Sequence, residues 1–365
     1  MKVILSNYDS LKNPYYAGGG AIATHKLASH LAKKHQVTVL CGKYPHFKNS
    51  KQDRVFYKHI GIVWGGPQFG QIIFFLVLHV SVFTEIFDLW IESFFTPAFI
   101  PLFTKKPVIG LVHMLAGPDL KRKYKLPFPV LEWVGFKVYR SIITTSQEIQ
   151  KTVVSYSPKA EVVVIPNGID LPKQLVRRKK KHILFVGRIE VNQKGLDLLL
   201  SAYKKVESEI KITLVIAGSG ERRELSLLHA MVLENGLSKQ VKLVGHVGGI
   251  KKKKLLEEAL YIIIPSRFET FCMVVLDAFA YGIPVITFDI KGLSWVPSQF
   301  SQKVASFSVG DLADAIKKMA VNEDFRNKKS YGTKEYIKQF EWKHVLHKYE
   351  EYVDTVMKRH YGKAH

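Results

Sequence analysis

At 365 residues the chain exceeds the length at which one hydrophobic core usually stops growing, which favours two domains. A composition of 47% hydrophobic and 23% charged residues excludes a disordered protein. The cysteines, Cys41 and Cys272, lie far apart in the sequence and form no disulfide framework, which favours a reduced, cytoplasmic compartment. The formal net charge of +23 predicts an anionic partner, although any single basic run is more often a solvated face.

The first half of the chain alternates short apolar runs with helix-length segments, an order typical of buried parallel strands between helices. The apolar run within residues 1–7 is too short for a signal peptide and predicts a first strand. The most apolar segment, 72–83, is shorter than the ~20 residues needed to cross a membrane, so we predict a buried helix there. Further strands are expected at 37–40, 108–112, 141–145 and 161–165, and a helix at 21–34.

The second half repeats this alternation after a boundary at 170–181, which carries Pro172 and the basic run 177–181. Strands are expected at 182–186, 212–217, 241–244, 261–264 and 285–287, and helices at 195–206 and 221–235. A final helix is expected over 342–359, because helical periodicity brings its apolar residues onto one face. The residues on that face are Trp342, Val345, Leu346, Tyr349, Tyr352, Val353 and Val356.

Three motifs fall where strands give way to helices, and there ligands bind in open α/β sheets. The first is Gly18, Gly19 and Gly20, whose backbone can approach a ligand, although such turns are as often structural. The second follows the strand at 182–186. It comprises Gly187 and Arg188, with Lys194 six residues later, and these two cations suit a phosphate.

The third motif, 265–285, is the most informative, because a strand end, a loop, a helix start and a Gly-x-Pro turn follow one another. The loop carries Glu269 and the helix carries Asp277, while the backbone amides around 271–274 would point from the helix start towards a phosphate or sugar. A structural carboxylate on a helix face is the plainer interpretation of Asp277. Gly218 and Gly220 begin a dinucleotide fingerprint, but Arg223 replaces its third glycine.

Together these residues resemble the retaining glycosyltransferases of family 4, which have the GT-B fold and include bacterial mannosyl- and glucosyltransferases. The resemblance covers nearly the whole chain. It runs through the glycines at 18–20, DLWIE at 88–92, KPVIGLVH at 106–113, IPNGID at 165–170, Arg188 with Lys194, AGSG at 217–220 and the segment 269–284.

The resemblance implies two Rossmann-like doubly wound domains that face each other across a cleft. It places an acceptor-binding domain at 1–170, a nucleotide-sugar-binding domain at 182–340, and a C-terminal helix at 341–365 that crosses back to the first domain. Arg188 and Lys194 match the pair that holds the donor diphosphate, Glu269 the glutamate that binds the sugar hydroxyls, and His113 a histidine beside the reacting sugar. The remaining donor-binding positions are Gly18, Gly19, Gly20, Gly187, Gly218, Gly220, Thr270, Phe271, Cys272, Met273, Val274 and Asp277.

Two of these positions depart from the family pattern. Asp277 stands where a glutamate usually binds the ribose, so the carboxylate reaches one methylene less far. Cys272 stands where glycine is frequent, which would narrow the pocket for the donor sugar. The sequence has no Asp-x-Asp motif, which is the usual metal anchor of the other nucleotide-sugar transferase fold, so we expect no metal cofactor.

We therefore expect a retaining, metal-independent transferase that moves a sugar from a UDP- or GDP-sugar to a glycan or lipid-linked acceptor. A sugar-nucleotide 2-epimerase of the same architecture, a non-catalytic sugar-nucleotide-binding module and a basic nucleic-acid-binding protein remain alternatives. The basic runs lack the interleaved aromatic residues of a single-strand platform. Instead, the charge and the cluster at 121–125 predict peripheral contact with an anionic membrane at its cytoplasmic face.

Overall fold

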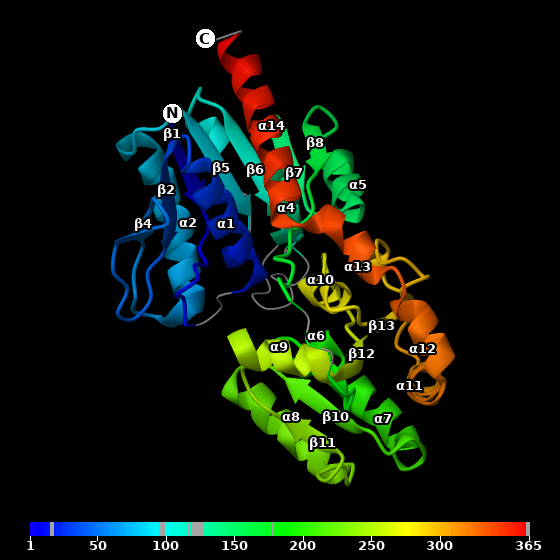
Figure 1. Cartoon of the computed structure of the whole chain (residues 1–365). Helices are drawn as coiled ribbons and strands as arrows, with labels where there is room; N and C mark the ends of the chain where they lie inside the picture. The colour runs from blue at the N-terminus through cyan, green and yellow to red at the C-terminus, as the bar shows by residue number, and fades with distance from the viewer. Residues whose placement is uncertain are drawn as a thin grey trace. The chain divides into compact units, whose positions relative to one another are not determined.

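The structure, a computed structural model, describes residues 1–14, 18–94, 99–115, 117, 128–174, 176 and 178–362. Its contacts divide the chain into two compact units, shown in Figure 1. Unit 1 contains Met1–Gly168 together with Trp342–His365, and unit 2 contains Ile169–Glu341. The chain thus passes from unit 1 to unit 2 between Gly168 and Ile169, and the basic run at 177–181 belongs to unit 2.

Unit 1 is built on an eight-stranded sheet in the order β3-β4-β2-β1-β5-β6-β7-β8. Its pairs are parallel except β3 with β4, which are antiparallel at the edge. The strands are β1 (Lys2–Ser6), β2 (Gln36–Gly42), β3 (Ser50–Gln52), β4 (Val55–Ile60), β5 (Leu89–Phe94), β6 (Val108–Val112), β7 (Ser141–Thr144) and β8 (Glu161–Val164).

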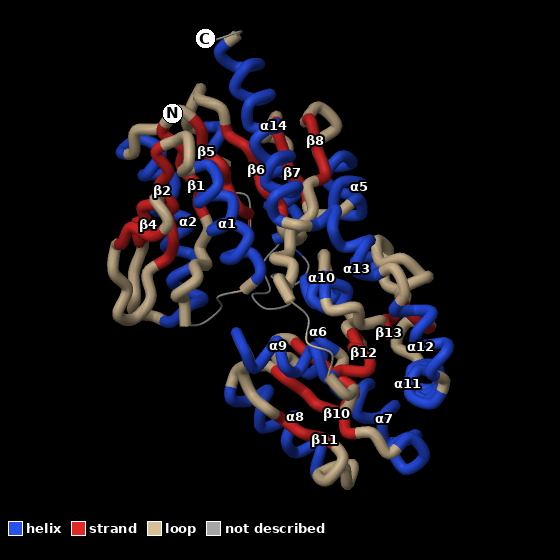
Figure 2. The backbone as a smooth tube through the Cα atoms, viewed as in Figure 1, coloured by secondary structure: helices blue, strands red, loops and turns tan. Residues whose placement is uncertain are grey.

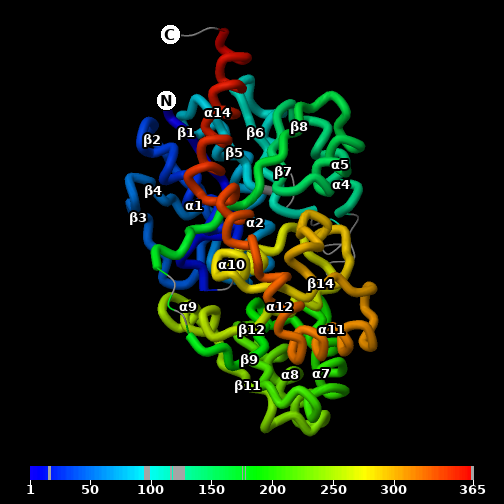
Figure 3. Tube along the Cα trace, turned by 45° about the vertical axis from the view of Figure 1, so that its right-hand side comes forward, coloured from blue at the N-terminus to red at the C-terminus, as the bar shows by residue number. Residues whose placement is uncertain are grey.

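Helices cover both faces of this sheet because successive side chains of a strand point to opposite sides. Val3 and Leu5 of β1 pack with helices α1 (Gly19–Leu31) and α14 (Trp342–Tyr361), whereas Ile4 packs on the other face. That other face is covered by α2 (Gly66–Thr84), α4 (Phe128–Phe136) and α5 (Gln147–Tyr156). Helix α14 (red) lies alongside α1 (blue) in Figures 1 and 3.

Unit 2 has a six-stranded, fully parallel sheet in the order β11-β10-β9-β12-β13-β14, with helices on both faces (Figure 2). The strands are β9 (His182–Val186), β10 (Thr213–Ala217), β11 (Val241–Leu243), β12 (Ala259–Ile264), β13 (Val285–Phe288) and β14 (Ser301–Val304). The helices are α6 (Val191–Lys194), α7 (Leu196–Ile210), α8 (Arg222–Glu234), α9 (Gly249–Glu258), α10 (Met273–Ala280), α11 (Val309–Val321), α12 (Glu323–Ser330) and α13 (Thr333–Tyr336).

Most expected elements are present, and α14 buries the seven side chains that its apolar periodicity selects. Four strands were not predicted from the sequence: β3, β4, β5 and β14. The sequences of β3 and β14, SKQ and SQKV, are too short and polar to give an apolar signal. The 170–181 stretch is no free linker either, since Arg178 and Lys181 pair with the buried carboxylates of Glu257 and Glu258.

The helix predicted over 72–83 is present, but the prediction that it is buried is wrong. Helix α2 is longer, spanning Gly66–Thr84, and only one side of it packs on the sheet, through Phe74, Leu78 and Val82. Its other side is exposed. By length and composition alone, α2 is also the one helix among the described residues that could cross a membrane.

Candidate donor and acceptor half-sites

Unit 2 gathers most of the predicted donor-binding residues at the carboxyl ends of β9 and β12. Strand β9 is the centre of the sheet, and the chain winds outwards from it to β10 and then returns to β12 on its other side. At such a reversal the loops diverge and leave room for a ligand. Gly187 and Arg188 follow β9, and Glu269 lies in the loop after β12.

Lys194 and Glu269 form the most enclosed ion pair of this half-site. The Lys194 Nζ lies 2.7 Å from the Glu269 Oε1, and both side chains are largely buried. The Ser266 Oγ donates to the same carboxylate oxygen at 2.7 Å. The structure therefore brings together two residues that are 75 positions apart and that the sequence analysis assigned to different parts of the donor.

Arg188 lies in the loop between β9 and α6 and makes other contacts. Its guanidinium is 3.0 Å from the Glu190 carboxylate and donates to the Gln193 Oε1 at 3.2 Å, and its side chain is about half exposed. Arg188 and Lys194 thus do not share a partner. The arginine keeps surface open to a ligand, whereas the lysine is held at the base of the loop by Glu269.

The loop that carries Glu269 is fixed by contacts with no sequence signal. Gly292 is required there, because a Cβ atom at this position would lie 1.8 Å from the Glu269 carbonyl oxygen. The Phe271 ring stacks on Trp295 at 4.7 Å, and the Trp295 Nε1 donates to the Phe271 carbonyl oxygen at 2.8 Å. Arg267 binds both carboxylate oxygens of Asp197 on α7, at 2.7 and 2.6 Å. Through these contacts the surrounding residues hold the Glu269 loop in place.

Helix α10 begins at Met273, so the predicted backbone cradle of Thr270, Phe271, Cys272, Met273 and Val274 includes a helix N-terminus. The first amides of a helix have no partner within it and favour an anion. Cys272 is buried and has φ of 61°, a conformation that glycine adopts without strain. This explains why glycine suits the position, and burial raises the pKa of the Cys272 thiol, so it remains protonated at neutral pH.

Asp277 does not present a free carboxylate. Its Oδ2 lies 2.6 Å from the Nζ of Lys252 on α9, and the carboxylate is mostly buried. Burial raises the pKa of Asp277 above its ordinary value, and the Lys252 ammonium opposes that shift. Nothing in the sequence distinguishes Lys252, because it lies in the run of four lysines at 251–254, and a single basic run is more often a solvated face.

Gly218 and Gly220 have a packing reason to be glycine. A Cβ at Gly218 would lie 1.8 Å from the carbonyl oxygen of Gly187, and one at Gly220 would lie 2.1 Å from that of Ile189. Their absent side chains let the loop after β10 lie against the loop after β9. Direct contact of either residue with a donor stays a prediction.

Unit 1 holds a smaller, uncharged group of predicted residues at the carboxyl ends of β1 and β6. Gly18 is the N-cap of α1, and its amide donates to the Asp9 carboxylate at 2.9 Å. A Cβ at Gly20 would lie 3.8 Å from the His113 ring and 4.0 Å from the Asn7 side-chain nitrogen, so these residues are close neighbours. Gly19 follows as the first residue of α1.

His113, directly after β6, is the most perturbed group in this half-site. Both ring nitrogens are buried and have no hydrogen-bond partner among the described residues, although the residue as a whole keeps some exposed surface. Burial lowers the pKa of His113 to about 4, so the imidazole is neutral near pH 7. A neutral imidazole without a partner can donate one hydrogen bond to a sugar hydroxyl and accept another.

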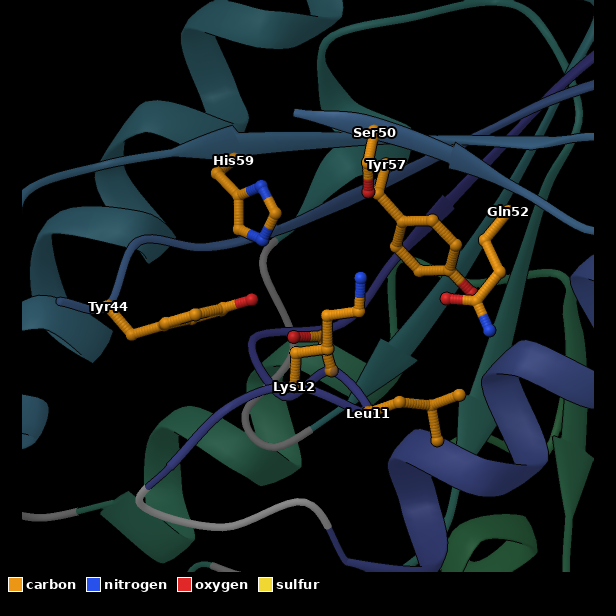
Figure 4. Close-up of a pocket in the computed structure, with 8 residues that line it drawn as sticks. Leu11, Lys12, Tyr44, Ser50, Gln52, Tyr57 and His59 are labelled. Carbon is orange, nitrogen blue, oxygen red and sulfur yellow. The ribbon is translucent and has the colours of Figure 1, made fainter. Parts of the chain in front are cut away.

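A small cavity also opens in unit 1, between the loop after β1 and strands β3 and β4 (Figure 4). Its volume is about 20 Å³, enough for roughly one water molecule. The buried Nε2 of His59, which lines it, has no partner among the described residues. Because a nucleotide sugar is many times larger, this cavity is not a donor site.

Comparison with known proteins matches both units of the chain. The family model for "Glycosyltransferase Family 4" matches residues 17–173, and that for "Glycosyl transferases group 1" matches 169–336. An uncharacterized glycosyltransferase of Methanocaldococcus jannaschii is 34% identical over 171 residues, which cover 42% of this chain and 43% of that relative. The GDP-mannose:cellobiosyl-diphosphopolyprenol alpha-mannosyltransferase of Xanthomonas oryzae is 24% identical over 268 residues, covering 70% of each chain.

Solved structures share the fold over almost the full length. Sucrose-phosphate synthase from Thermosynechococcus elongatus superposes with a TM-score of 0.81 at 17% identity, covering 98% of this chain and 99% of that one. Anabaena Alr3699/HepE in complex with UDP-glucose superposes with a TM-score of 0.78 at 15% identity, covering 97% and 100%. The two parallel α/β sheets, the order of the motifs along them and these matches establish that the chain belongs to the family 4 glycosyltransferases and has the GT-B fold.

Proposed function

We propose that this chain transfers a sugar from a UDP- or GDP-sugar to a glycan or lipid-linked acceptor, with retention of configuration and without a metal ion. The observation that carries the proposal is the buried Lys194–Glu269 pair where β9 and β12 end, with Arg188 on the loop beside it. In this arrangement one cation and one carboxylate lie within a single hydrogen bond of each other. A diphosphate and the hydroxyls of its sugar need these two kinds of partner.

The chemical step breaks the bond between the anomeric carbon and the donor diphosphate. Negative charge grows on the leaving phosphate oxygens, and stabilising that charge in place is the largest effect available to the protein. In our proposal Lys194, Arg188 and the amides at the start of α10 supply the stabilisation, while Glu269 accepts hydrogen bonds from the donor sugar. Lys194 then exchanges one of its contacts with Glu269 for a phosphate oxygen.

Retention requires that the acceptor attack from the face that the diphosphate leaves, or that a carboxylate form an intermediate on the opposite face. We favour the first route, in which the departing phosphate accepts the proton of the acceptor hydroxyl. Neutral His113 would then bind the donor sugar rather than act as an acid, because its lowered pKa leaves it unprotonated at neutral pH.

Support for the choice of substrates comes from the relatives. The Xanthomonas protein is named for GDP-mannose and for an acceptor on a polyprenol diphosphate, while the Anabaena structure contains UDP-glucose. None of the alternative functions is favoured, because the matching families and these relatives are glycosyltransferases. We propose a cytoplasmic protein that works at the inner face of a membrane. The predicted basic cluster at 121–125 lies outside the described residues.

Thermal unfolding in the presence of UDP- and GDP-sugars tests the donor proposal. Bound ligand stabilises the folded state by RT ln(1 + [L]/Kd), so a true donor at ~100 times its Kd adds about 2.7 kcal/mol. We expect a clear increase in Tm for one nucleotide series and little for the other. Transfer to a lipid-linked acceptor, with analysis of the anomeric product, separates the transferase from an epimerase. The proposal fails if neither nucleotide series binds.

A further inference from the structure

The outer side of α2 is a continuous apolar ridge. Leu76 is 55% exposed, Val80 59% and Phe83 72%, and helical spacing places them in one row. Phe69 and Ile72 extend the row towards the helix start, and the whole helix contains no charged residue. By contrast α14, on the opposite face of the same sheet, exposes mainly charged and polar side chains. The ridge is therefore a local property of α2 and not of the sheet's helices in general.

Neighbouring elements widen this ridge into a surface. The Phe103 ring lies 6.2 Å from Phe83 and 5.1 Å from His79, and the Trp64 ring lies 5.3 Å from Phe69. Helix α4 covers the same face of the sheet at another place, where it contacts α5, and it also turns apolar residues outwards. The exposed residues of α4 are Val130, Leu131, Trp133 and Val134. We name the outward side chains of α2 and α4, with those of Trp64, Leu102 and Phe103, the α2–α4 surface.

The exposed charges on the segment that carries the α2–α4 surface have one sign among the described residues. Between positions 61 and 140, the exposed charged residues among those described are all basic: Lys105, Lys106, Lys137 and Arg140. The acidic residues that the structure describes in that segment are buried or half-buried, and the Glu85 carboxylate is paired with Lys58 at 2.5 Å. The Lys137 ammonium lies over the exposed Trp133 ring at 3.1 Å, so a cation and an aromatic side chain are presented together.

We propose that the α2–α4 surface docks on the face of an anionic lipid bilayer. Apolar side chains rimmed by lysine and arginine suit an interface where acyl chains lie beneath negative headgroups. The inner side of α2 packs in the core through Phe74, Leu78 and Val82, so the helix lies along the membrane surface instead of crossing it. This inference rests on the proposed function only for the role of docking, which is to bring unit 1 to a lipid-linked acceptor.

A second copy of the chain fits this surface less well. A two-fold symmetric interface joins the same patch from both copies, and it would bring the basic residues of one copy against those of the other. Like charges opposed in a partly desolvated interface disfavour association. An anionic bilayer instead supplies the opposite charge along with the apolar layer.

Vesicle co-sedimentation tests the proposal with the full chain and a variant that carries Leu76→Ser, Val80→Ser and Phe83→Ser. On vesicles of equal parts phosphatidylglycerol and phosphatidylcholine, we expect the parent to bind and the variant's partition coefficient to fall about 100-fold, since three exposed apolar side chains no longer enter the bilayer. The matched control is Leu233→Ser on α8, which removes a 67% exposed leucine from unit 2. Its binding should equal that of the parent.

Three outcomes would overturn the inference: no binding of the parent at low ionic strength, equal binding of parent and triple variant, or a parent dimer that the triple variant dissolves. Thermal shifts with UDP- and GDP-sugars accompany each variant. An unchanged shift shows that the triple variant is folded and that its donor site is intact. A parent that binds vesicles but no nucleotide sugar would contradict the proposed function and leave the docking surface in place.

Discussion

The two half-sites differ in how they hold their functional groups. In the unit 2 half-site three cations are already paired with carboxylates: Lys194 with Glu269, Lys252 with Asp277, and Arg188 with Glu190. In unit 1 the group at the end of β6 is a neutral histidine whose ring nitrogens have no partner among the described residues. The unit 2 half-site thus presents cations that are already paired, whereas the unit 1 half-site presents a neutral histidine without a described partner, near the Asp9 carboxylate that binds the Gly18 amide.

Each half-site has its own consequence for the proposed function. Paired side chains stay ordered before the donor arrives, so a cation needs little rearrangement to meet a diphosphate. A sugar carries no charge and is recognised by hydrogen bonds, which an unpartnered imidazole can offer. The comparison therefore predicts large effects of charge removal in unit 2 and an effect of protonation in unit 1.

Removing a clamp cation should have the largest effect. We expect Lys194→Ala or Arg188→Ala to lower kcat by ~100-fold or more, as the loss of a preorganised charge donor does. Steady-state transfer assays measure the effect, and circular dichroism checks that both proteins are folded. Lys205→Ala, which removes an exposed lysine of α7, is the control and should be neutral. If kcat of the Lys194 and Arg188 variants stays within threefold of the parent, these two cations do not stabilise the leaving diphosphate.

Low pH should lower the free energy of unfolding, because the buried His113 resists protonation in the folded protein. Its pKa is about 4 in the folded protein and about 6.5 when unfolded, so the unfolded chain binds a proton first as the pH falls. Its contribution to stability is therefore present above pH 6.5 and is lost between about pH 6.5 and 4, amounting to about 3 kcal/mol. His113→Gln should abolish this part of the acid sensitivity.

Urea unfolding at pH 7 and at pH 4.5 measures the His113 contribution. The other buried histidines titrate in both proteins, so the difference between parent and variant isolates this residue. His344→Gln, on the exposed side of α14, should behave like the parent. If the His113→Gln protein loses as much stability in acid as the parent, then His113 is hydrated and its role as an unpartnered sugar contact is wrong.

Loss of the Asp277 carboxylate should weaken donor binding by about 1.5–3 kcal/mol, the range for hydrogen bonds to charged groups. Asp277→Glu should be tolerated, because it restores the glutamate typical of the family and lengthens the reach to the ribose. Isothermal titration with the donor nucleotide gives both values. Tight binding by Asp277→Ala would show that the carboxylate serves only Lys252 and belongs to the helix packing.

A substitution of Lys252, the ion-pair partner of Asp277, should have a smaller effect. Lys252→Met removes the ammonium that opposes the burial of Asp277, so the pKa of that carboxyl should rise further above its ordinary value. We expect donor affinity to become pH-dependent at the acidic end, with weaker binding as Asp277 protonates. An affinity that is unchanged from the parent at every pH would show that Lys252 does not position Asp277.

How much of this could be predicted from the sequence depends on the range of the interactions. Strand ends and helix starts have local signals, so the sequence analysis identified Arg188, Lys194, Glu269 and the start of α10. The contacts that join them have none, since Gly292 and Trp295 meet the Glu269 loop from a separate part of the chain. Lys252 was hidden in a lysine run, where nothing distinguishes the one that faces a buried carboxylate.

The prediction that α2 is buried was wrong for a related reason. The apolar content of segment 72–83 favours burial, but whether a helix is buried on its outer side depends on which other elements pack against it. Its periodicity would have selected Phe74, Leu78 and Val82 as one side and Leu76, Val80 and Phe83 as another, but both sides are apolar. Hydrophobic periodicity predicts an orientation only when the two sides of a helix differ, as they do in α14.

The smallest expected effect is that of chelation. Among the described residues, no group of three or more histidine, cysteine, aspartate or glutamate side chains is placed to hold a metal ion. If the paired cations of unit 2 stabilise the leaving diphosphate, transfer in excess EDTA should proceed within about twofold of the untreated rate, a change of less than about 0.5 kcal/mol in the barrier. Loss of activity with EDTA, restored by magnesium or manganese, would mean that a metal carries charge that we assign to Lys194 and Arg188. In that case the contrast between a half-site of paired cations and one that presents a neutral histidine would no longer hold.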